Sequence, residues 1–238
     1  MKRIIYAAAI AAITAASACG GHTERRASQA DTIALAPCPT FQTDSAMTHI
    51  QRQCAFGPRV TGSVAAQRCG DYIAECFRQY GAEVSEQPVE AVLYDETHLE
   101  GRNIIARLNT SNPDRLLLCA HWDSRPWADN DPVERNWLKP VPAANDGASG
   151  VAVLLELCRL LQQAPIPVGI DFVCFDAEDL GAPKWERPED DEDSDWCQGS
   201  QAWAQRAATE GYRARYGILL DMVGGRGSTF ARELISRR

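Results

Sequence analysis

Short apolar runs alternate along this chain with segments of helical periodicity, and this alternation constrains the fold more than any other feature. Four runs are bounded by turn residues, as β-strands are: "RNIIARLN", "RLLLCAHWD", "VGIDFVCFDAED" and "YGILLDMVGG". Apolar residues at helical spacing fill Ala65 to Tyr80, where Gly81 ends the pattern, and residues 142–163 and 199–211 predict two more helices. Strands that alternate with helices indicate an α/β sandwich with a largely parallel sheet.

Length and charge limit the classes of protein. The chain has 238 residues, of which 45% are hydrophobic, enough for one sizeable core in a single domain. Its net charge of −8 argues against nucleic acid and against an anionic membrane surface as partners.

The N-terminus has the composition of an export signal. Lys2 and Arg3 precede an apolar stretch from Ile4 to Ala16 that is too short to span a bilayer. The stretch ends in "ASAC", which resembles the signal of a bacterial lipoprotein with Cys19 as the lipidated residue; a plain cleaved signal is the alternative. We expect a signal peptide over 1–19, a flexible tether over 20–36 and the folded domain over 37–238, in an exported protein anchored in the cell envelope.

The remaining cysteines and one acidic segment give weaker signals. Without Cys19, eight of the nine cysteines remain, and an even number in an exported protein permits disulfides without fixing their pairing. Cys119 and Cys174 lie inside strand-like runs, which favours small buried side chains. The acid-rich segment "WERPEDDEDSDW", residues 185–196, is typical of a solvated loop, because the spacing of an EF-hand calcium loop is absent.

Metal-ligand side chains recur where the predicted strands end. Ligands of open α/β sheets bind beyond the carboxyl ends of the strands, so these side chains should converge. They are His121, Asp123, Asp176, Glu178, Asp179 and Asp221, together with Asp146 just before the long helix. Carboxylates with one imidazole suit a divalent ion such as zinc. The small residues from Gly147 to Gly150 would leave room for a metal and a substrate beside Asp146.

The motifs "FGPRVTGS", "AHWDSRPWADND", "ANDGASGVAVLLEL", "FDAEDLG" and "LDMVGG" follow one another in the order found in the zinc-dependent aminopeptidase family. Within that family, the chain from about Phe41 onward most resembles the bacterial-type glutaminyl cyclases, the glutaminyl-peptide cyclotransferases. The resemblance implies a three-layer α/β/α sandwich around a mixed, largely parallel sheet. It also implies one zinc ion per active site, peptide or protein substrates with an N-terminal glutamine, and a monomer when full length.

The resemblance also implies roles for individual residues. Asp146 and Asp179 match zinc ligands, Glu178 matches the general acid/base, and Asp221 matches an acid of the active-site network. His121 is a further candidate ligand, since it matches the second-metal histidine of the aminopeptidases. Asp123 would orient its imidazole.

The same residues serve two reactions, and the surrounding aromatic side chains favour one of them. A cyclase must exclude water while the substrate amine attacks, and Trp122, Trp127 and Trp185 could line an apolar substrate pocket. The insertion 182–197 also looks more like the cyclases than the peptidases. A zinc aminopeptidase that releases N-terminal residues is the alternative.

Compared with the family pattern, the chain stops early. It ends in "FARELISRR", soon after Asp221, whereas family members continue to a further histidine that completes the zinc site. None of the histidines at positions 22, 49 and 98 is a natural substitute. We therefore expect a C-terminally truncated chain with an incomplete site, and an inactive metal- or peptide-binding fragment is a third reading.

Overall fold

The computed structural model describes residues 38–163, 166–186 and 195–230. The elements in these ranges are α1 (Thr43–Ala55), α2 (Val64–Gln79), β1 (Glu83–Val92), β2 (His98–Leu108), β3 (Arg115–His121), a 3₁₀ turn (Glu134–Asn136), α3 (Ala148–Leu161), β4 (Gly169–Phe175), α4 (Gln198–Thr209) and β5 (Gly217–Leu219).

The described strands form one mixed sheet in the order β1-β2-β4-β3-β5. The strand β3 runs parallel to both β4 and β5, with Cys119 opposite Val173 on one side and Leu219 on the other. The pairs β1–β2 and β2–β4 are antiparallel. The expected mixed α/β fold is confirmed, and its parallel pairings lie in the half of the sheet that carries the predicted ligands.

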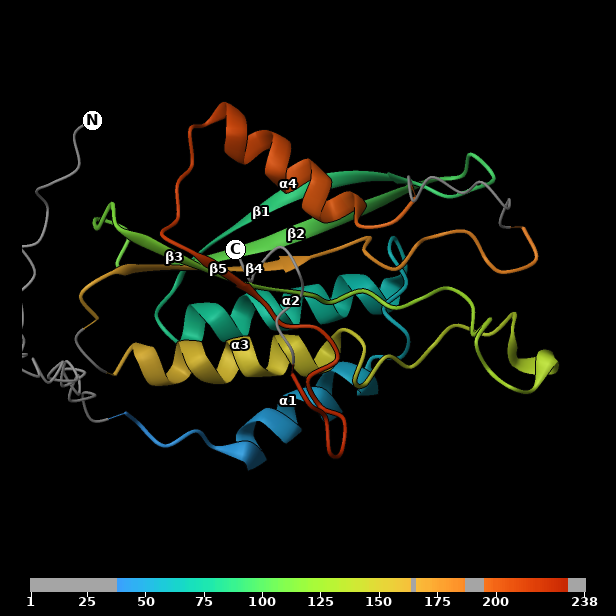
Figure 1. The fold of residues 1–238 in the computed structure, drawn as a ribbon, viewed down its shortest axis with the longest axis horizontal. Helices are drawn as coiled ribbons and strands as arrows, with labels where there is room; N and C mark the ends of the chain where they lie inside the picture. The colour runs from blue at the N-terminus through green and yellow to red at the C-terminus, as the bar shows by residue number, and fades with distance from the viewer. Residues whose placement is uncertain (1–37, 164–165, 187–194, 231–238) are drawn as a thin grey trace, which may run out of the picture. The chain divides into compact units, whose positions relative to one another are not determined.

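Helices cover both faces of the sheet, as the sandwich prediction requires (Figure 1). The helix α4 lies over one face, α2 and α3 lie over the other, and α1 packs on the far side of α3. The main core fills the space between the sheet and α2 and α3, where the rings of Phe77 and Phe172 lie 5.5 Å apart. A smaller cluster under α4 includes Cys119, Phe175 and Trp203.

Local sequence explains where the second helix begins and ends. The Ser63 hydroxyl accepts a hydrogen bond from the Ala66 N–H, which satisfies one of the unpaired donors of the first turn of α2. Gly81 follows the helix with φ +78, a conformation that glycine adopts without steric cost. The helix buries one face against the core, as its sequence periodicity predicted.

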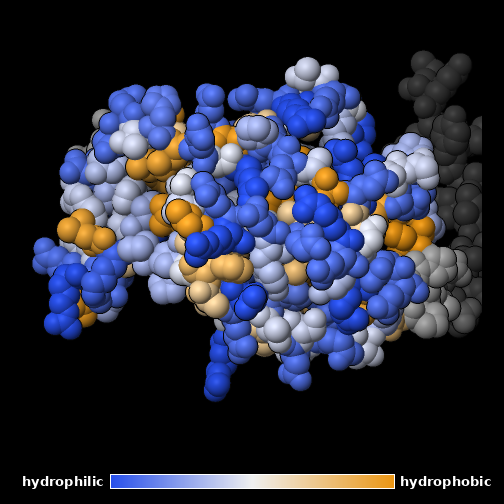
Figure 2. All heavy atoms as spheres, turned by 180° about the vertical axis from the view of Figure 1, so that it is seen from behind, coloured by the Kyte–Doolittle hydropathy of each residue, from blue (hydrophilic) through white to orange (hydrophobic). Residues whose placement is uncertain are grey.

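Seven cysteines of the described residues are free thiols: Cys54, Cys69, Cys76, Cys119, Cys158, Cys174 and Cys197. Cys119 and Cys174 are buried in β3 and β4, so their prediction as small buried side chains is confirmed. The predicted signal, the tether, Cys19 and most of the acidic segment lie outside the described residues. No helix in the described part of the chain is long and apolar enough to cross a membrane. Figure 2 shows a predominantly hydrophilic face with small, separate hydrophobic patches.

Candidate metal and catalytic site

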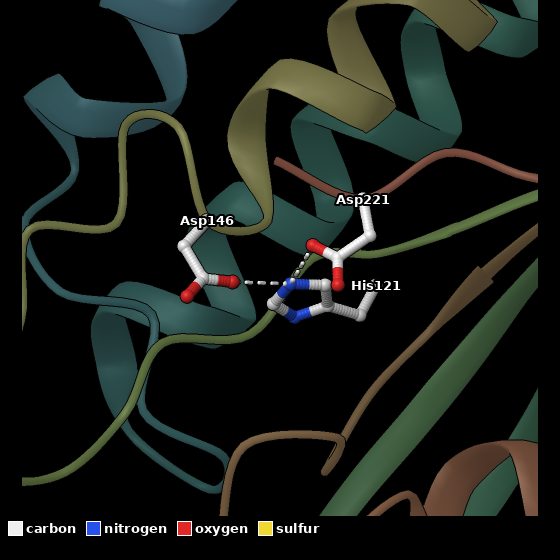
Figure 3. Close-up of side chains that lie close together, drawn as sticks. All are labelled: His121, Asp146 and Asp221. Carbon is white, nitrogen blue, oxygen red and sulfur yellow. Dashed lines mark hydrogen bonds and ion pairs between the residues drawn. The ribbon is translucent and has the colours of Figure 1, made fainter. Parts of the chain in front are cut away.

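The site lies at the carboxyl edge of the parallel strands, where the chain leaves β3, β4 and β5. His121 is the last residue of β3, Asp221 follows β5, and Asp146 immediately precedes Gly147, the residue that caps α3. Figure 3 shows both aspartate side chains pointing toward the His121 ring. The sequence prediction that these distant segments converge is therefore correct for these three residues.

The three side chains are close enough to share one ion. The His121 Nε2 atom lies 2.8 Å from Asp146 Oδ1 and 3.6 Å from Asp221 Oδ1 (Figure 3). One ligand-type atom from each of the three residues lies within 4.8 Å of the others. His121 is buried, Asp146 is half-buried and Asp221 is exposed, so the group is accessible from one side.

The other ring nitrogen of His121 is held by a buried acid. Its Nδ1 lies 3.2 Å from Asp123 Oδ1, as the sequence indicated, and Asp123 Oδ2 accepts the backbone N–H of Asp179. Burial alone would lower the pKa of His121, but hydrogen bonds to Asp123, Asp146 and Asp221 raise it well above its ordinary value. Asp123 therefore fixes the ring orientation and leaves Nε2 directed at the carboxylates of Asp146 and Asp221.

These residues fit a zinc ion by their chemistry and by their support. Two carboxylates and an imidazole are ordinary zinc ligands, and tetrahedral bonds of about 2.0–2.1 Å separate neighbouring ligand atoms by roughly 3.3 Å. The observed separations of 2.8 and 3.6 Å from His121 Nε2 bracket that value. A carboxylate on the far nitrogen of a ligand histidine is also the usual outer support of such sites. His121, Asp146 and Asp221 thus form a possible zinc site.

Glu178 and Asp179 are adjacent in sequence but have different partners. The Glu178 Oε2 atom lies 3.8 Å from His121 Nδ1, beside the possible metal group. Asp179 is buried, and its Oδ1 lies 3.3 Å from a guanidinium nitrogen of Arg125. Burial raises the pKa of Glu178, and burial with the charges of Asp123 and Asp146 raises that of Asp179 to about 8. The assignment of Asp179 as a metal ligand stays a prediction.

The small residues after Asp146 give room to the protein itself, not only to a ligand. A Cβ atom on Gly147 would lie 2.9 Å from the Asp123 carbonyl oxygen and 3.2 Å from His121 Cε1. A Cβ on Gly150 would meet the Leu220 carbonyl and lie 2.9 Å from Ala120 Cβ. These contacts show that the two glycines allow backbone and ring atoms to pack closely around Asp146, and their role in leaving space for a metal and substrate stays a prediction.

The three predicted pocket tryptophans lie in different surroundings. Trp122 is 1% exposed and packs in the main core. Trp127 makes an edge-to-face contact with Tyr94. Trp185 is 40% exposed and stacks on Trp137 with an interplanar angle of 8°. Their role in substrate binding stays a prediction, and Trp122, which faces the core, is the least accessible of the three.

Arg125 is an important residue that the sequence reasoning missed. Its guanidinium forms a bidentate pair with Asp129 and also contacts Asp179 and the carbonyl groups of Gly181 and Ala182. It also lies 4.8 Å from the centre of the Trp196 ring. A cation between Asp123 and Trp127 was a usable signal, since a buried cluster of acids needs a positive partner.

A small cavity of about 150 Å³ lies next to these acids. It is lined by Cys119, His121, Phe175, Glu178, Cys197, Ser200, Leu219 and Asp221. Most of this lining is apolar, whereas Glu178 and Asp221 supply carboxylates, so the cavity places proton-transfer groups beside an apolar wall.

Comparisons with known proteins agree with this geometry. The chain is 45% identical to a Bacteroides thetaiotaomicron glutaminyl cyclase whose structure contains N-acetylhistamine, with a TM-score of 0.78 over 82% of this chain and 66% of that one. It is also 45% identical to a leucine aminopeptidase precursor from the same species, with a TM-score of 0.79 over 82% of this chain and 67% of that one. Aminopeptidase YwaD of Bacillus subtilis is 30% identical over 127 residues, which are 51% of this chain and 25% of the relative.

The matched segments span a quarter to less than half of the curated relatives and about two thirds of the solved structures. The sequence model of peptidase family M28 matches residues 103–235, which include every strand-end acid described above. This match covers more than half of the chain and agrees with the zinc-exopeptidase fold of the solved structures. The chain belongs to peptidase family M28.

Proposed function

We propose that the protein is a zinc-dependent glutaminyl-peptide cyclotransferase, which converts the N-terminal glutamine of a peptide to pyroglutamate and releases ammonia. The observation that carries this proposal is the 45% identity to a glutaminyl cyclase over 82% of the chain. Further glutaminyl cyclases, from Tannerella forsythia and Porphyromonas gingivalis, are 47% and 44% identical. The substrates would be peptides or proteins with glutamine as the first residue.

The geometry supports different roles for the individual site residues. His121, Asp146 and Asp221 would hold the zinc ion, with Asp179 as the further ligand that the sequence predicts. A bound zinc ion supplies a Lewis acid that polarises the side-chain amide of the substrate glutamine. Asp123 would hold the His121 ring in its orientation, because Asp123 Oδ1 lies 3.2 Å from His121 Nδ1.

Glu178 would move the proton. Its carboxylate lies beside the possible metal group and on the small cavity, and burial raises its pKa toward neutrality. Glu178 would accept a proton from the attacking α-amine and deliver it to the departing ammonia. The attack is intramolecular, so the apolar wall would mainly hold the glutamine in a ring-like conformation and exclude water.

A zinc aminopeptidase is the second candidate, and a specific observation favours it. The leucine aminopeptidase precursor from B. thetaiotaomicron is as similar to this chain as the glutaminyl cyclase is. Both reactions need the same metal and a proton-transfer acid, but hydrolysis needs a water molecule where cyclisation needs an attacking amine.

The deciding experiment gives the purified protein a peptide with N-terminal glutamine and, separately, one with N-terminal leucine. We expect a loss of 17 mass units, about that of ammonia, from the first peptide and no free leucine from the second. Release of leucine without any pyroglutamate would instead establish the aminopeptidase. Zinc content measured on the same sample would show whether the ion is bound.

For localisation, we propose a cell-envelope lipoprotein anchored through Cys19, with the membrane contacted only by the lipid and no nucleic-acid partner. The order of charged, apolar and small residues before Cys19 supports this proposal. The Cys19→Ala variant should move from the membrane fraction to the soluble exported fraction. An unchanged distribution would leave Cys19 as part of an ordinary cleavage region. We further propose a monomeric enzyme.

A further inference from the structure

Backbone hydrogen bonds link Cys197 and the residue after it to Glu178 and the residue before that. The Cys197 N–H donates to the Glu178 carbonyl at 2.9 Å, and the next N–H, of Gln198, donates to the Ala177 carbonyl at 2.9 Å. These two bonds tie the start of α4 to the segment that follows β4. Cys197 has φ 57 and ψ 26, a left-handed conformation that is costly for a residue with a side chain. The structure therefore holds this cysteine in a strained position beside Glu178.

The side chain of Cys197 makes a second link to the same residue. Its Sγ donates to Glu178 Oε1 at 3.5 Å, while Glu178 Oε2 lies 3.8 Å from His121 Nδ1. Among the described residues, this thiol is the one hydrogen-bond donor to the Glu178 carboxylate. The carboxylate is thus held between the thiol on one side and the His121 ring on the other.

The Cys197 thiol is suited to donate a hydrogen bond and not to act as a nucleophile. Burial, together with the charge of Glu178, raises the pKa of Cys197 to about 11, so the thiol keeps its proton at neutral pH. Both Cys197 and Glu178 line the small cavity with His121 and Asp221. The contact between Cys197 and Glu178 therefore lies in the cavity that His121 and Asp221 also line.

We propose that Cys197 is a positioning residue that aims the Glu178 carboxylate for proton transfer through its thiol. This inference rests on the proposed function of Glu178. It extends that function because it assigns the orientation of the carboxylate to a residue outside the strand-end acids.

The kinetic test uses three variants that distinguish the effect of losing the thiol donor from the effect of relieving the backbone strain. Cys197→Ala removes the donor and keeps the strain. Cys197→Gly removes the donor and relieves the strain, so it should be as stable as the wild type or more stable. Each should lower kcat on a glutaminyl peptide by about 3- to 10-fold, the value of one hydrogen bond, with KM changed less than about twofold. Cys197→Ser, which restores a donor, should recover most of the lost kcat.

A second measurement needs no turnover. Alkylation of Cys197 by iodoacetamide at pH 8, read by mass spectrometry of its peptide, is compared between the wild type and Glu178→Gln. Loss of the carboxylate charge lowers the thiol pKa, so alkylation should be faster by about threefold or more. The half-buried Cys54, which lies outside the cavity, should react equally in both proteins.

The outcomes separate the two proposals. Equal alkylation in both proteins, or a Cys197→Gly enzyme with wild-type kcat, would overturn the positioning role. A wild type that forms no pyroglutamate but shows the alkylation difference would refute the cyclase proposal and leave the thiol–carboxylate contact established.

Discussion

Gly147 offers the sharpest test of how the backbone positions the metal group. It caps α3 directly after Asp146, with φ 94 and ψ −57, which is outside the regions that other residues favour. A methyl group there would lie 2.9 Å from the Asp123 carbonyl oxygen and 3.2 Å from His121 Cε1. The Gly147→Ala substitution therefore adds backbone strain and pushes on the ring that faces Asp146.

The expected cost follows from these contacts. A residue with a side chain at such dihedral angles costs about 1–3 kcal/mol. The tight contacts add about 1–3 kcal/mol as overpacking. The lower entropy of the unfolded chain offsets about 0.4–1 kcal/mol. The free energy of unfolding should fall by about 3 kcal/mol, which a domain with 5–15 kcal/mol (about the usual range) survives folded.

The structure provides a matched control. Gly211 also has positive φ, at +67, but a methyl group there would meet nothing within 4 Å. Gly211→Ala should therefore cost only about 0.5–1 kcal/mol, from left-handed strain less the entropy gain. Denaturant unfolding measures both changes, and zinc titration of the folded proteins measures the site. Zinc affinity should fall about 10- to 100-fold in Gly147→Ala, as for other changes to residues that support metal ligands, and stay constant in the control.

Two results would refute this reasoning. If both variants lost the same stability, the contacts of Gly147 with Asp123 and His121 would contribute nothing. If Gly147→Ala lost stability but bound zinc as tightly as the wild type, the His121 ring would not belong to the metal site.

Three further predictions address the acids and their partners. Glu178→Gln should lower kcat by a factor of about 10² or more and leave zinc content unchanged; lost zinc with unchanged residual turnover would reverse the roles of Glu178 and Asp179. Arg125→Lys should lower the free energy of unfolding by about 2–4 kcal/mol, because it breaks a buried bidentate pair with Asp129, and an unchanged denaturation midpoint would contradict this. Burial and the charge of Asp123 raise the pKa of Asp176 from 3.8 to about 7, so its contribution to stability is fully present below about pH 4 and is lost as the pH rises to about 7. Unfolding between about pH 4 and 7, the window between the unfolded and folded pKa values, should thus be less pH-dependent in Asp176→Asn than in the wild type, and equal slopes would exclude the titration of Asp176.

The sequence predicted the half of the fold that carries the site better than the other half. The strands β3 and β4 are largely apolar, apart from the ion-paired Asp171 of β4, because helices cover both their faces. The strand β1 was not predicted. Its sequence, "EVSEQPVEAV", contains a proline and five polar residues, and only Gln87, Val89 and Ala91 are buried. Burial alternates along the second half of β1, so one face is covered there and the apolar signal is weak, and the position of β1 at the sheet edge tolerates the proline.

The same limit applies to the site. Strand ends place acids at one edge of the sheet, and this reasoning correctly brought His121, Asp146 and Asp221 together. It could not predict which partner each of the neighbouring carboxylates of Glu178 and Asp179 contacts. Asp179 faces Arg125, and that pairing depends on a loop that lies 54 residues earlier in the chain. The resemblance to known enzymes assigned Asp179 to the metal, whereas the structure places Asp221 with His121.

This difference makes Arg125 central to the chemistry of the edge. Asp179 has two competing partners, the guanidinium that it contacts and the metal that the family resemblance assigns to it. A guanidinium keeps its charge at every accessible pH, so its attraction to Asp179 persists whether or not a cation is bound nearby. Arg125 also holds Asp129 and the carbonyl groups of Gly181 and Ala182, which lie at the start of the insertion. Movement of Asp179 toward His121 would break one of these contacts and leave the others. The network can therefore hold Gly181 and Ala182 in place while one carboxylate changes partner.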